Sequence, residues 1–233
     1  MPRPRAGTSV HIRQIVDRLA EVHGDLPWGR RHDPVSELVT TILSHSTTDA
    51  NQIAAFDELR RRFPTWDEVR DAPTDEVIDA VRVAGMSGQK GPRVQRALDI
   101  VAADGRGDDL EWLGEVPIDE AMEFLVAIPG VGPKTAACVL CFCFDAHVCP
   151  VDTHVHRIAL RTRMVSRKTD AIATQTKLTR AIPEGQAYSA HMRMIAHGRT
   201  ICTARSPKCE RCPVLELCPF GRARVGGQSA LTS

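Results

Sequence analysis

Four cysteines stand close together near the C-terminal end of this chain, in the spacing Cys202-x6-Cys209-x2-Cys212-x5-Cys218. The residues between them are mostly polar, charged or proline, so this segment lacks the side chains that build an apolar core. Four thiolates in so short a stretch are typical of a metal centre, either one tetrahedral zinc ion or an iron–sulfur cluster. This part of the chain is therefore expected to fold around a metal.

The other four cysteines have the opposite surroundings. Cys138, Cys141 and Cys143 lie in the apolar run 135–144, and Cys149 follows it. In such surroundings cysteine behaves as a small buried hydrophobe, so we expect core packing rather than a second metal site. The sequence shows neither the apolar region of a signal peptide nor a long apolar run, so we expect a cytoplasmic protein whose cysteines stay reduced.

The overall charge of the chain does not indicate a partner. Lys+Arg 30 against Asp+Glu 29 gives a formal net charge of +1, so a polyanion would have to be bound through local clusters of basic residues. Three such clusters are Arg60–Arg62, Lys90 with Arg93 and Arg96, and the group between Arg161 and Lys168. Each cluster, taken alone, is also typical of a solvated helix face.

Apolar residues recur with helical spacing along most of the chain. Asp33-Pro34 looks like an N-cap followed by a first helical position. Thr65 with Glu68 forms a capping-box pattern, and Thr74 is predicted to cap a segment that ends at Gly85. Further helices are expected around 94–101, 121–128, 154–163, 174–181 and 188–198. Because no stretch shows the alternation of a strand, we predict an all-α fold.

A glycine-rich segment, Ile128-Pro129-Gly130-Val131-Gly132-Pro133, lies between two of the expected helices. Gly130 and Gly132 allow backbone angles closed to other residues, and Pro133 suits the first position of the next helix. A bare Gly-x-Gly is also typical of an ordinary helix–helix turn. Here the flanking apolar residues extend it to the helix-hairpin-helix pattern, whose backbone amides bind a phosphate oxygen without reading sequence.

Two candidate catalytic side chains follow the hairpin. Lys134 stands in the first turn of the next helix, where a lysine is usually a solvated charge. The positive helix end, with partial burial, would favour its neutral amine, which could attack a sugar C1′ and form a Schiff base. Asp152, in Val151-Asp152-Thr153-His154, is equally a good helix N-cap and a carboxylate able to stabilise an oxocarbenium-like transition state. Both interpretations of Asp152 remain open.

The same motifs occur in the same order in the endonuclease III family of DNA glycosylases, which this chain resembles from about Asp33 to Cys218. The resemblance rests on Ile128–Ala136, on Val151–His154, and on His197-Gly198-Arg199 leading into the four cysteines. Together these motifs are highly specific for that family.

The resemblance implies two helical domains with a DNA-binding cleft between them. A six-helix barrel with the helix-hairpin-helix motif would span 27–145. The second domain would combine 9–26 with 146–220 and hold a 4Fe–4S cluster. Residues 1–8 and 221–233 are expected to be disordered tails.

The resemblance also implies roles for single residues. Lys134 matches the Schiff-base lysine, and Asp152 matches the catalytic aspartate. The cluster ligands would be Cys202, Cys209, Cys212 and Cys218. The DNA contacts would come from Gly130, Val131, Gly132, Ser46, Met86, Lys90 and His154.

The chain departs from the family at residues expected to enter the DNA. Ser46 takes the place of a glutamine that fills the space left by the extruded base, and a serine is too short to span that space. Met86 takes the place of the apolar wedge, and Ser87-Gly88 replaces a bulkier Tyr-Asn pair. Met86 must therefore help to offset the cost of unstacking a base, about a few kcal/mol.

The sequence therefore predicts a monomeric base excision repair enzyme that acts on duplex DNA at the nucleoid. We expect a bifunctional glycosylase and AP lyase that removes oxidised pyrimidines and nicks the strand by β-elimination through Lys134. A monofunctional adenine-mismatch glycosylase is the enzymatic alternative, which Lys134 argues against. The alternative from another class is a catalytically weak DNA-binding protein that scans for damage.

Overall fold

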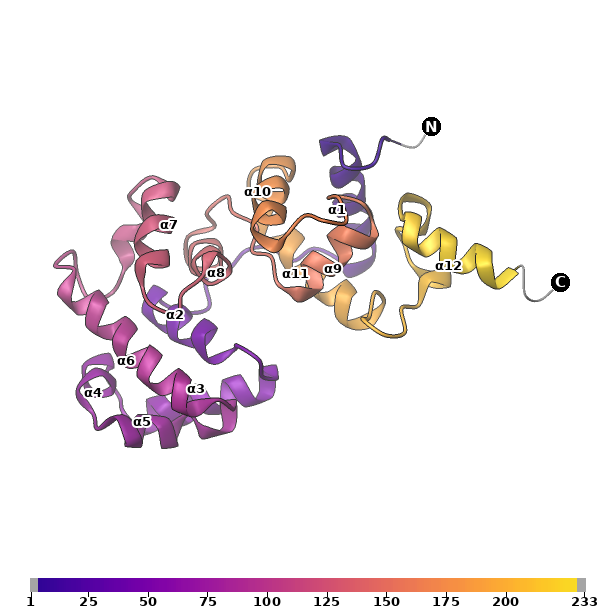
Figure 1. Ribbon diagram of the computed structural model, residues 1–233. Coiled ribbons are helices and arrows are strands. Elements are labelled where there is room, and N and C mark those ends of the chain that lie inside the picture. Colours follow the sequence, from indigo (N-terminus) through magenta and orange to yellow (C-terminus); the bar gives the residue numbers. More distant parts are fainter. Residues whose placement is uncertain (1–3, 230–233) are drawn as a thin grey trace. The chain divides into compact units, whose positions relative to one another are not determined.

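The computed structural model describes residues 4–229, and every regular element in them is an α-helix or a short 3-10 helix. The chain divides into two compact units (Figure 1). The hairpin unit is Arg30–Ala146, and the cysteine unit consists of the residues up to Gly29 together with those from His147 onward. The predicted all-α, two-domain fold class is confirmed. None of the helices described combines the length and the hydropathy that a membrane span requires.

The hairpin unit is built around the contact between α2 and α8. Its elements are α2 (Pro34–Leu43), α3 (Asp49–Arg62), α4 (Trp66–Asp71), α5 (Thr74–Ala80), η1 (Arg82–Ala84), α6 (Ser87–Ala103), η2 (Glu111–Gly114), α7 (Ile118–Ala127) and α8 (Pro133–Phe144). α2 also packs against α3 and α6, while α7 packs on α8, and α4 and α5 pack on α6. Because Cys138, Cys141 and Cys143 are all buried on α8, their predicted role in core packing is confirmed.

The cysteine unit joins the two ends of the chain. Its elements are α1 (Ser9–His23), α9 (Thr153–Arg161), α10 (Ala171–Ala181), α11 (Ala187–Thr200), η3 (Cys209–Arg211), η4 (Leu215–Leu217) and α12 (Pro219–Ser229). α1, drawn in indigo in Figure 1, packs against α10 and α11, and α11 also packs against α9. Cys149 belongs to the apolar core that these helices share. The N-terminal helix therefore completes the core of the C-terminal half of the chain.

Most helix starts follow the local sequence. Asp33 caps α2, and Thr65 begins α4 with the predicted capping box. The predicted cap at Thr74 is wrong, because Pro73 is the N-cap and Thr74 is the first helical residue. Because proline has no side-chain acceptor, α5 starts without a side-chain cap. The following turn closes at Gly85, whose φ of 68° favours glycine.

The predicted disorder of the two tails is wrong where the structure describes them. Residues 221–229 belong to α12. The first turn of this helix packs against the rest of the cysteine unit. The Phe220 ring lies 4.5 Å from the Arg161 guanidinium, and Gly221 is buried. At the other end, Thr8 is the N-cap of α1. The predicted tail residues 1–3 and 230–233 lie outside the described residues.

One carboxyl group is buried in the hairpin unit. Glu37 on α2 is only 6% exposed, and its Oε1 accepts a hydrogen bond from the Thr41 hydroxyl at 3.2 Å. Burial raises the pKa of Glu37 to about 7, although the Thr41 hydrogen bond and the charge of Lys134 act in the opposite direction. The folded protein therefore holds this proton more tightly than the unfolded chain, in which the carboxyl has its usual value of 4.5.

We predict that Glu37→Gln changes how stability depends on pH. The contribution of the Glu37 proton to stability is fully present below pH 4.5 and is lost as the pH rises through 7. This pKa difference corresponds to at most about 3 kcal/mol. Between pH 4.5 and pH 8, urea unfolding should show that the wild type loses up to this amount relative to Glu37→Gln.

Glu76→Gln, at an exposed carboxyl of α5, removes the same charge without the burial and serves as the control. An identical pH dependence in wild type and Glu37→Gln would contradict the raised pKa of Glu37.

Candidate active site and metal centre

The hairpin between α7 and α8 is a tight turn with one glycine-dependent position. Gly130 has a φ of 88°, whereas Gly132 has the extended angles −94° and 174° that any residue can adopt. The Val131 side chain is 4% exposed, and its amide donates to the Ile128 carbonyl at 2.9 Å. Because this hydrogen bond uses the Val131 amide within the turn, Val131 anchors the hairpin rather than offering an amide to a ligand.

The N-terminal end of α8 is open to an anion. Six helices, α1, α2, α3, α4, α9 and α10, begin with a side chain that caps the first turn. α8 has no such cap, because its N-cap is Gly132 and its first residue is Pro133. The side chain of Arg93 lies against the turn, since a Cβ at Gly130 would be 3.0 Å from its Cδ. Uncapped amides beside a guanidinium suit a phosphate oxygen.

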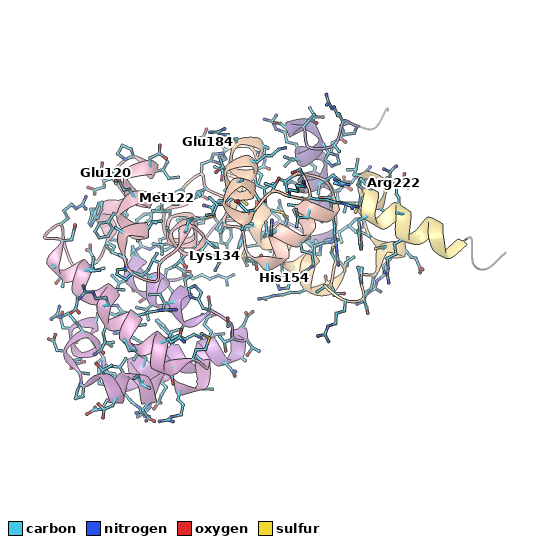
Figure 2. All side chains as sticks on the ribbon, viewed as in Figure 1. Glu120, Met122, Lys134, His154, Glu184 and Arg222 are labelled. Carbon is cyan, nitrogen blue, oxygen red and sulfur yellow. The ribbon has the colours of Figure 1, made fainter. Side chains whose placement is uncertain are left out.

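Lys134 stands in the first turn of α8, half-buried (Figure 2). Its positive charge lowers the pKa of two nearby side chains, Glu37 on α2 and His45 just after α2. Burial lowers the pKa of His45, and the nearby charge of Lys134 lowers it further. The His45 Nε2 lies 3.2 Å from the Thr135 hydroxyl, next to Lys134 along the chain. The candidate nucleophile is therefore coupled electrostatically to a carboxyl and an imidazole in the same unit.

Sequence reasoning missed this polar group. Glu37, Thr41 and His45 follow one another at intervals of four residues, which places them on one side of α2 and its extension. The sequence analysis interpreted this segment only from its apolar residues, which predict a helix that packs in the core. A charged residue and two further polar residues at i, i+4 and i+8 beside an apolar stripe were the signal, because such residues are buried only with partners.

The structure places Asp152 at the N-cap of α9, where its Oδ1 accepts a hydrogen bond from the Val155 amide at 2.8 Å. The predicted capping role is therefore confirmed. The side chain is half-buried. His154 is labelled in Figure 2, and its Nδ1 lies 3.1 Å from Arg157 Nη2. Its side chain packs on Gly198, since a Cβ atom added to Gly198 would lie only 2.8 Å from the Cβ of His154. The glycine of His-Gly-Arg thus permits the contact between α9 and α11.

The predicted DNA contact of Lys90 is wrong. Its side chain is 1% exposed, and its Nζ donates to the carbonyls of Leu43 and Ala84, each at 2.8 Å. Ser46 and Met86 do lie at the surface, both with left-handed backbone angles, φ 53° and φ 51°. Met86 is 50% exposed, as an apolar wedge requires.

The basic cluster at Arg60–Arg62 is engaged within the protein. Arg61 and Arg62 both pair with Glu58, and Arg62 also pairs with Asp79. Arg60 lies 4.4 Å from the ring of Trp66. These contacts fit the interpretation of the cluster as a solvated helix face.

The four late cysteines surround one cavity in the cysteine unit. Its lining includes Cys202, Cys209, Cys212 and Cys218 with Ile158, Ile201, Val214 and Phe220. Among residues 4–229, no three His, Cys, Asp or Glu side chains converge closely enough to hold one metal ion. Thiolates spaced around an apolar cavity fit an iron–sulfur cluster, whose ligands sit at its corners, better than a single zinc ion. Burial raises the pKa of Cys212 to about 11, so its thiolate depends on a metal partner.

Polar donors reach three of these sulfurs. Arg161 Nη1 lies 3.4 Å from Cys202 Sγ, and the Gly221 amide donates to Cys218 Sγ at 3.3 Å. His197 Nε2 lies 3.6 Å from Cys212 Sγ. Donors placed in this way stabilise sulfur that carries negative charge, as a metal-bound thiolate does.

Comparison with known proteins agrees with this geometry. Residues 39–184 match the family model of the HhH-GPD superfamily base excision DNA repair proteins. Residues 202–218 match the iron–sulfur binding domain of endonuclease III, a segment that begins and ends at two of the four cysteines.

Individual relatives point to the same family. An Arabidopsis thaliana protein whose name proposes a DNA glycosylase is 33% identical over 161 residues, which cover 69% of this chain and 55% of that protein. Endonuclease III of Sulfolobus acidocaldarius is 32% identical, over 73% of this chain and 74% of the relative. A solved trapped endonuclease III–DNA covalent intermediate is 30% identical, with a TM-score of 0.80 over 94% of this chain and 99% of that one. The chain therefore belongs to the endonuclease III family within the HhH-GPD superfamily of base excision DNA repair proteins.

Proposed function

We propose that this protein is a monomeric, bifunctional DNA glycosylase and AP lyase that removes oxidised pyrimidines from duplex DNA. The observation that carries the proposal is the position of Lys134 in the first turn of α8, directly after the Gly130 turn and beside an uncapped helix end. A phosphate bound at that helix end would bring the adjoining sugar near the lysine amine. The trapped covalent intermediate of the related endonuclease III is consistent with a covalent route.

The proposed reaction begins with the attack of the Lys134 amine on C1′ of the damaged nucleotide. The new C–N bond forms as the glycosidic bond breaks, and the base leaves with the bonding electrons and takes up a proton. Opening of the sugar ring gives a Schiff base. Loss of a C2′ proton then expels the 3′ phosphate by β-elimination, which nicks the strand, and water finally releases the sugar fragment and restores Lys134.

Lys134 must lose a proton before it can attack. The charge of Lys134 is coupled to the Glu37 carboxyl, whose pKa burial raises to about 7, and to the His45 imidazole. Near neutral pH the Glu37 carboxyl changes its charge beside Lys134, so the electrostatic surroundings of the candidate nucleophile depend on this carboxyl.

Asp152 is proposed to act on the sugar. One of its oxygens is held by the Val155 amide at 2.8 Å, which fixes the orientation of the carboxylate. A fixed carboxylate next to C1′ would stabilise the positive charge that develops as the base departs. Capping and catalysis then use the two oxygens of one side chain.

We predict that borohydride traps a covalent complex between the wild type and abasic-site DNA, and that Lys134→Gln abolishes it. Asp152→Asn should slow base release by about 10²-fold or more while DNA affinity changes little. Gel analysis of trapped complexes and single-turnover base release measure the two effects. Lys168→Gln, at an exposed lysine, is the control.

Three outcomes would contradict the proposal in different ways. Cross-linking by Lys134→Gln would mean that another amine is the nucleophile. Base release without any nicking by the wild type would indicate the monofunctional alternative. Tight binding to damaged duplexes without any chemistry would indicate a DNA-binding protein that scans for damage.

A further inference from the structure

Lys90 is the least exposed of the buried Lys, Arg, Asp and Glu side chains among the described residues, at 1%. Its ammonium donates to two main-chain carbonyls, of Leu43 and Ala84, each at 2.8 Å. Neutral acceptors compensate an ammonium only in part, and burial lowers the pKa of Lys90. An apolar side chain of similar length would fill the same space but would not bond the two carbonyls, so what the ammonium adds at this position is a link between two segments of the chain.

The carbonyls that Lys90 holds belong to two particular segments. Leu43 ends α2 and lies three residues before Ser46, and Ala84 ends η1 and lies two residues before Met86. Both Ser46 and Met86 have positive φ angles, a conformation that non-glycine residues keep only when their surroundings hold them there. The amide of Lys90 also donates to the Met86 carbonyl at 3.0 Å. One residue therefore ties the turn of Met86 to the loop of Ser46.

We propose that Lys90 is a positioning residue that sets the spacing between the Ser46 loop and the Met86 turn, the two segments that would enter the base stack. This inference rests on the proposed function. Extruding a paired base costs about a few kcal/mol, and an abasic site costs less. A loss of spacing between these two segments should therefore weaken the reaction on paired lesions and spare abasic sites.

The test replaces the ammonium and keeps the chain length, in Lys90→Met. Single-turnover base release is measured on duplexes with one paired oxidised pyrimidine, and borohydride trapping is measured on the same duplex with an abasic site. We expect about a tenfold or greater loss of base release on the paired lesion. Trapping at the abasic site should stay within about twofold of wild type.

The matched control is Gln95→Met on the same helix. Gln95 is 8% exposed, and the two N–H groups of its Nε2 are shared among three main-chain carbonyls, of Val69, Arg70 and Ala72, all within 3.2 Å. Like Lys90, Gln95 is buried and bonds main-chain carbonyls. Its carbonyls belong to α4 and the residue after it, away from the Ser46 loop and the Met86 turn. Equal losses on both substrates in Lys90→Met, or the same selective loss in Gln95→Met, would overturn the proposal.

Two further measurements keep the inference separate from the proposed function. If the wild type performs no chemistry, fluorescence of 2-aminopurine next to the lesion reports unstacking instead, and an unchanged signal in Lys90→Met overturns the role of Lys90. If Lys90→Met does not fold, Lys90→Gln, which keeps an N–H donor, takes its place. It should show a smaller selective loss, and a loss without selectivity would again contradict the proposal.

A second, independent observation concerns the metal centre. His197 on α11 is 1% exposed, with its Nε2 3.6 Å from Cys212 Sγ and its Nδ1 3.3 Å from His23 Nε2. The two imidazole rings meet edge to face, with centroids 5.5 Å apart and an interplanar angle of 81°. A metal-bound thiolate only accepts hydrogen bonds, so Nε2 of His197 carries the hydrogen there and Nδ1 accepts one from His23.

We infer that His23 holds His197 in the orientation that donates to Cys212, and that this hydrogen bond raises the reduction potential of the bound iron–sulfur cluster and slows its loss. Hydrogen bonds to ligand sulfurs tune cluster potentials, and outer partners of metal ligands affect metal retention by about 10–100-fold. His23 stands at the end of α1, so the N-terminal helix contributes to the metal centre through one side chain.

The test compares two replacements of His197 in the cluster-loaded protein. His197→Gln keeps an N–H donor near the position of Nε2, whereas His197→Leu has none. We expect a more negative potential by film voltammetry and about tenfold faster iron loss to a chelator in His197→Leu, with His197→Gln close to wild type. The potential and the rate of iron loss of His23→Leu should lie between those of His197→Leu and His197→Gln.

His191→Leu is the control, because His191 is also buried on α11 but bonds the Pro150 carbonyl at 2.8 Å instead of a cysteine. An equal change of potential in His191→Leu and His197→Leu would overturn the inference. An equal change in His197→Gln and His197→Leu would do so as well.

Discussion

The burial of α8 is the constraint on which the hairpin unit depends. Nearly all of this helix is enclosed, and many of its buried side chains are small, among them Ala136, Ala137 and Cys138. Small side chains let α2 and α7 pack closely on it. A helix enclosed in this way offers mainly its ends to a ligand, and its N-terminal end carries the Gly130 turn and Lys134. The position of the candidate nucleophile therefore follows from core packing.

The features that could be predicted from the sequence depend on residues close together in the chain. The capping box at Thr65, the N-cap at Asp152 and the apolar surroundings of Cys138 are of this kind. Lys90 is of another kind. Its sequence neighbours are polar or glycine, which indicates a surface position, but one of the carbonyls that receives its ammonium belongs to Leu43, 47 residues earlier. No local pattern contains that contact.

The cysteine unit shows the same division. The spacing of the four cysteines predicted the metal centre, because ligand spacing is a local property. The groups around the ligands come from distant elements. Arg161 on α9 binds the Thr203 and Ala204 carbonyls at 2.7 and 2.8 Å, and Arg157 binds the Cys202 carbonyl at 3.0 Å. Two guanidinium groups of α9 thus hold the segment after α11, and the sequence alone indicated neither contact, because the partners are main-chain carbonyls more than 40 residues away.

Glu37 and Lys90 are ionisable side chains buried in the hairpin unit, where burial disfavours their charged forms. Exposed pairs such as Arg62 with Glu58 contribute little to stability and cost little. The buried carboxyl and the buried ammonium each oppose folding in their charged forms, and neither has a charged partner within hydrogen-bonding distance among the described residues. Glu37 is coupled to Lys134, and Lys90 bonds the carbonyls that precede Ser46 and Met86. These two buried groups of the hairpin unit therefore lie where the proposed chemistry needs fixed geometry, which is the pattern expected of a functional site.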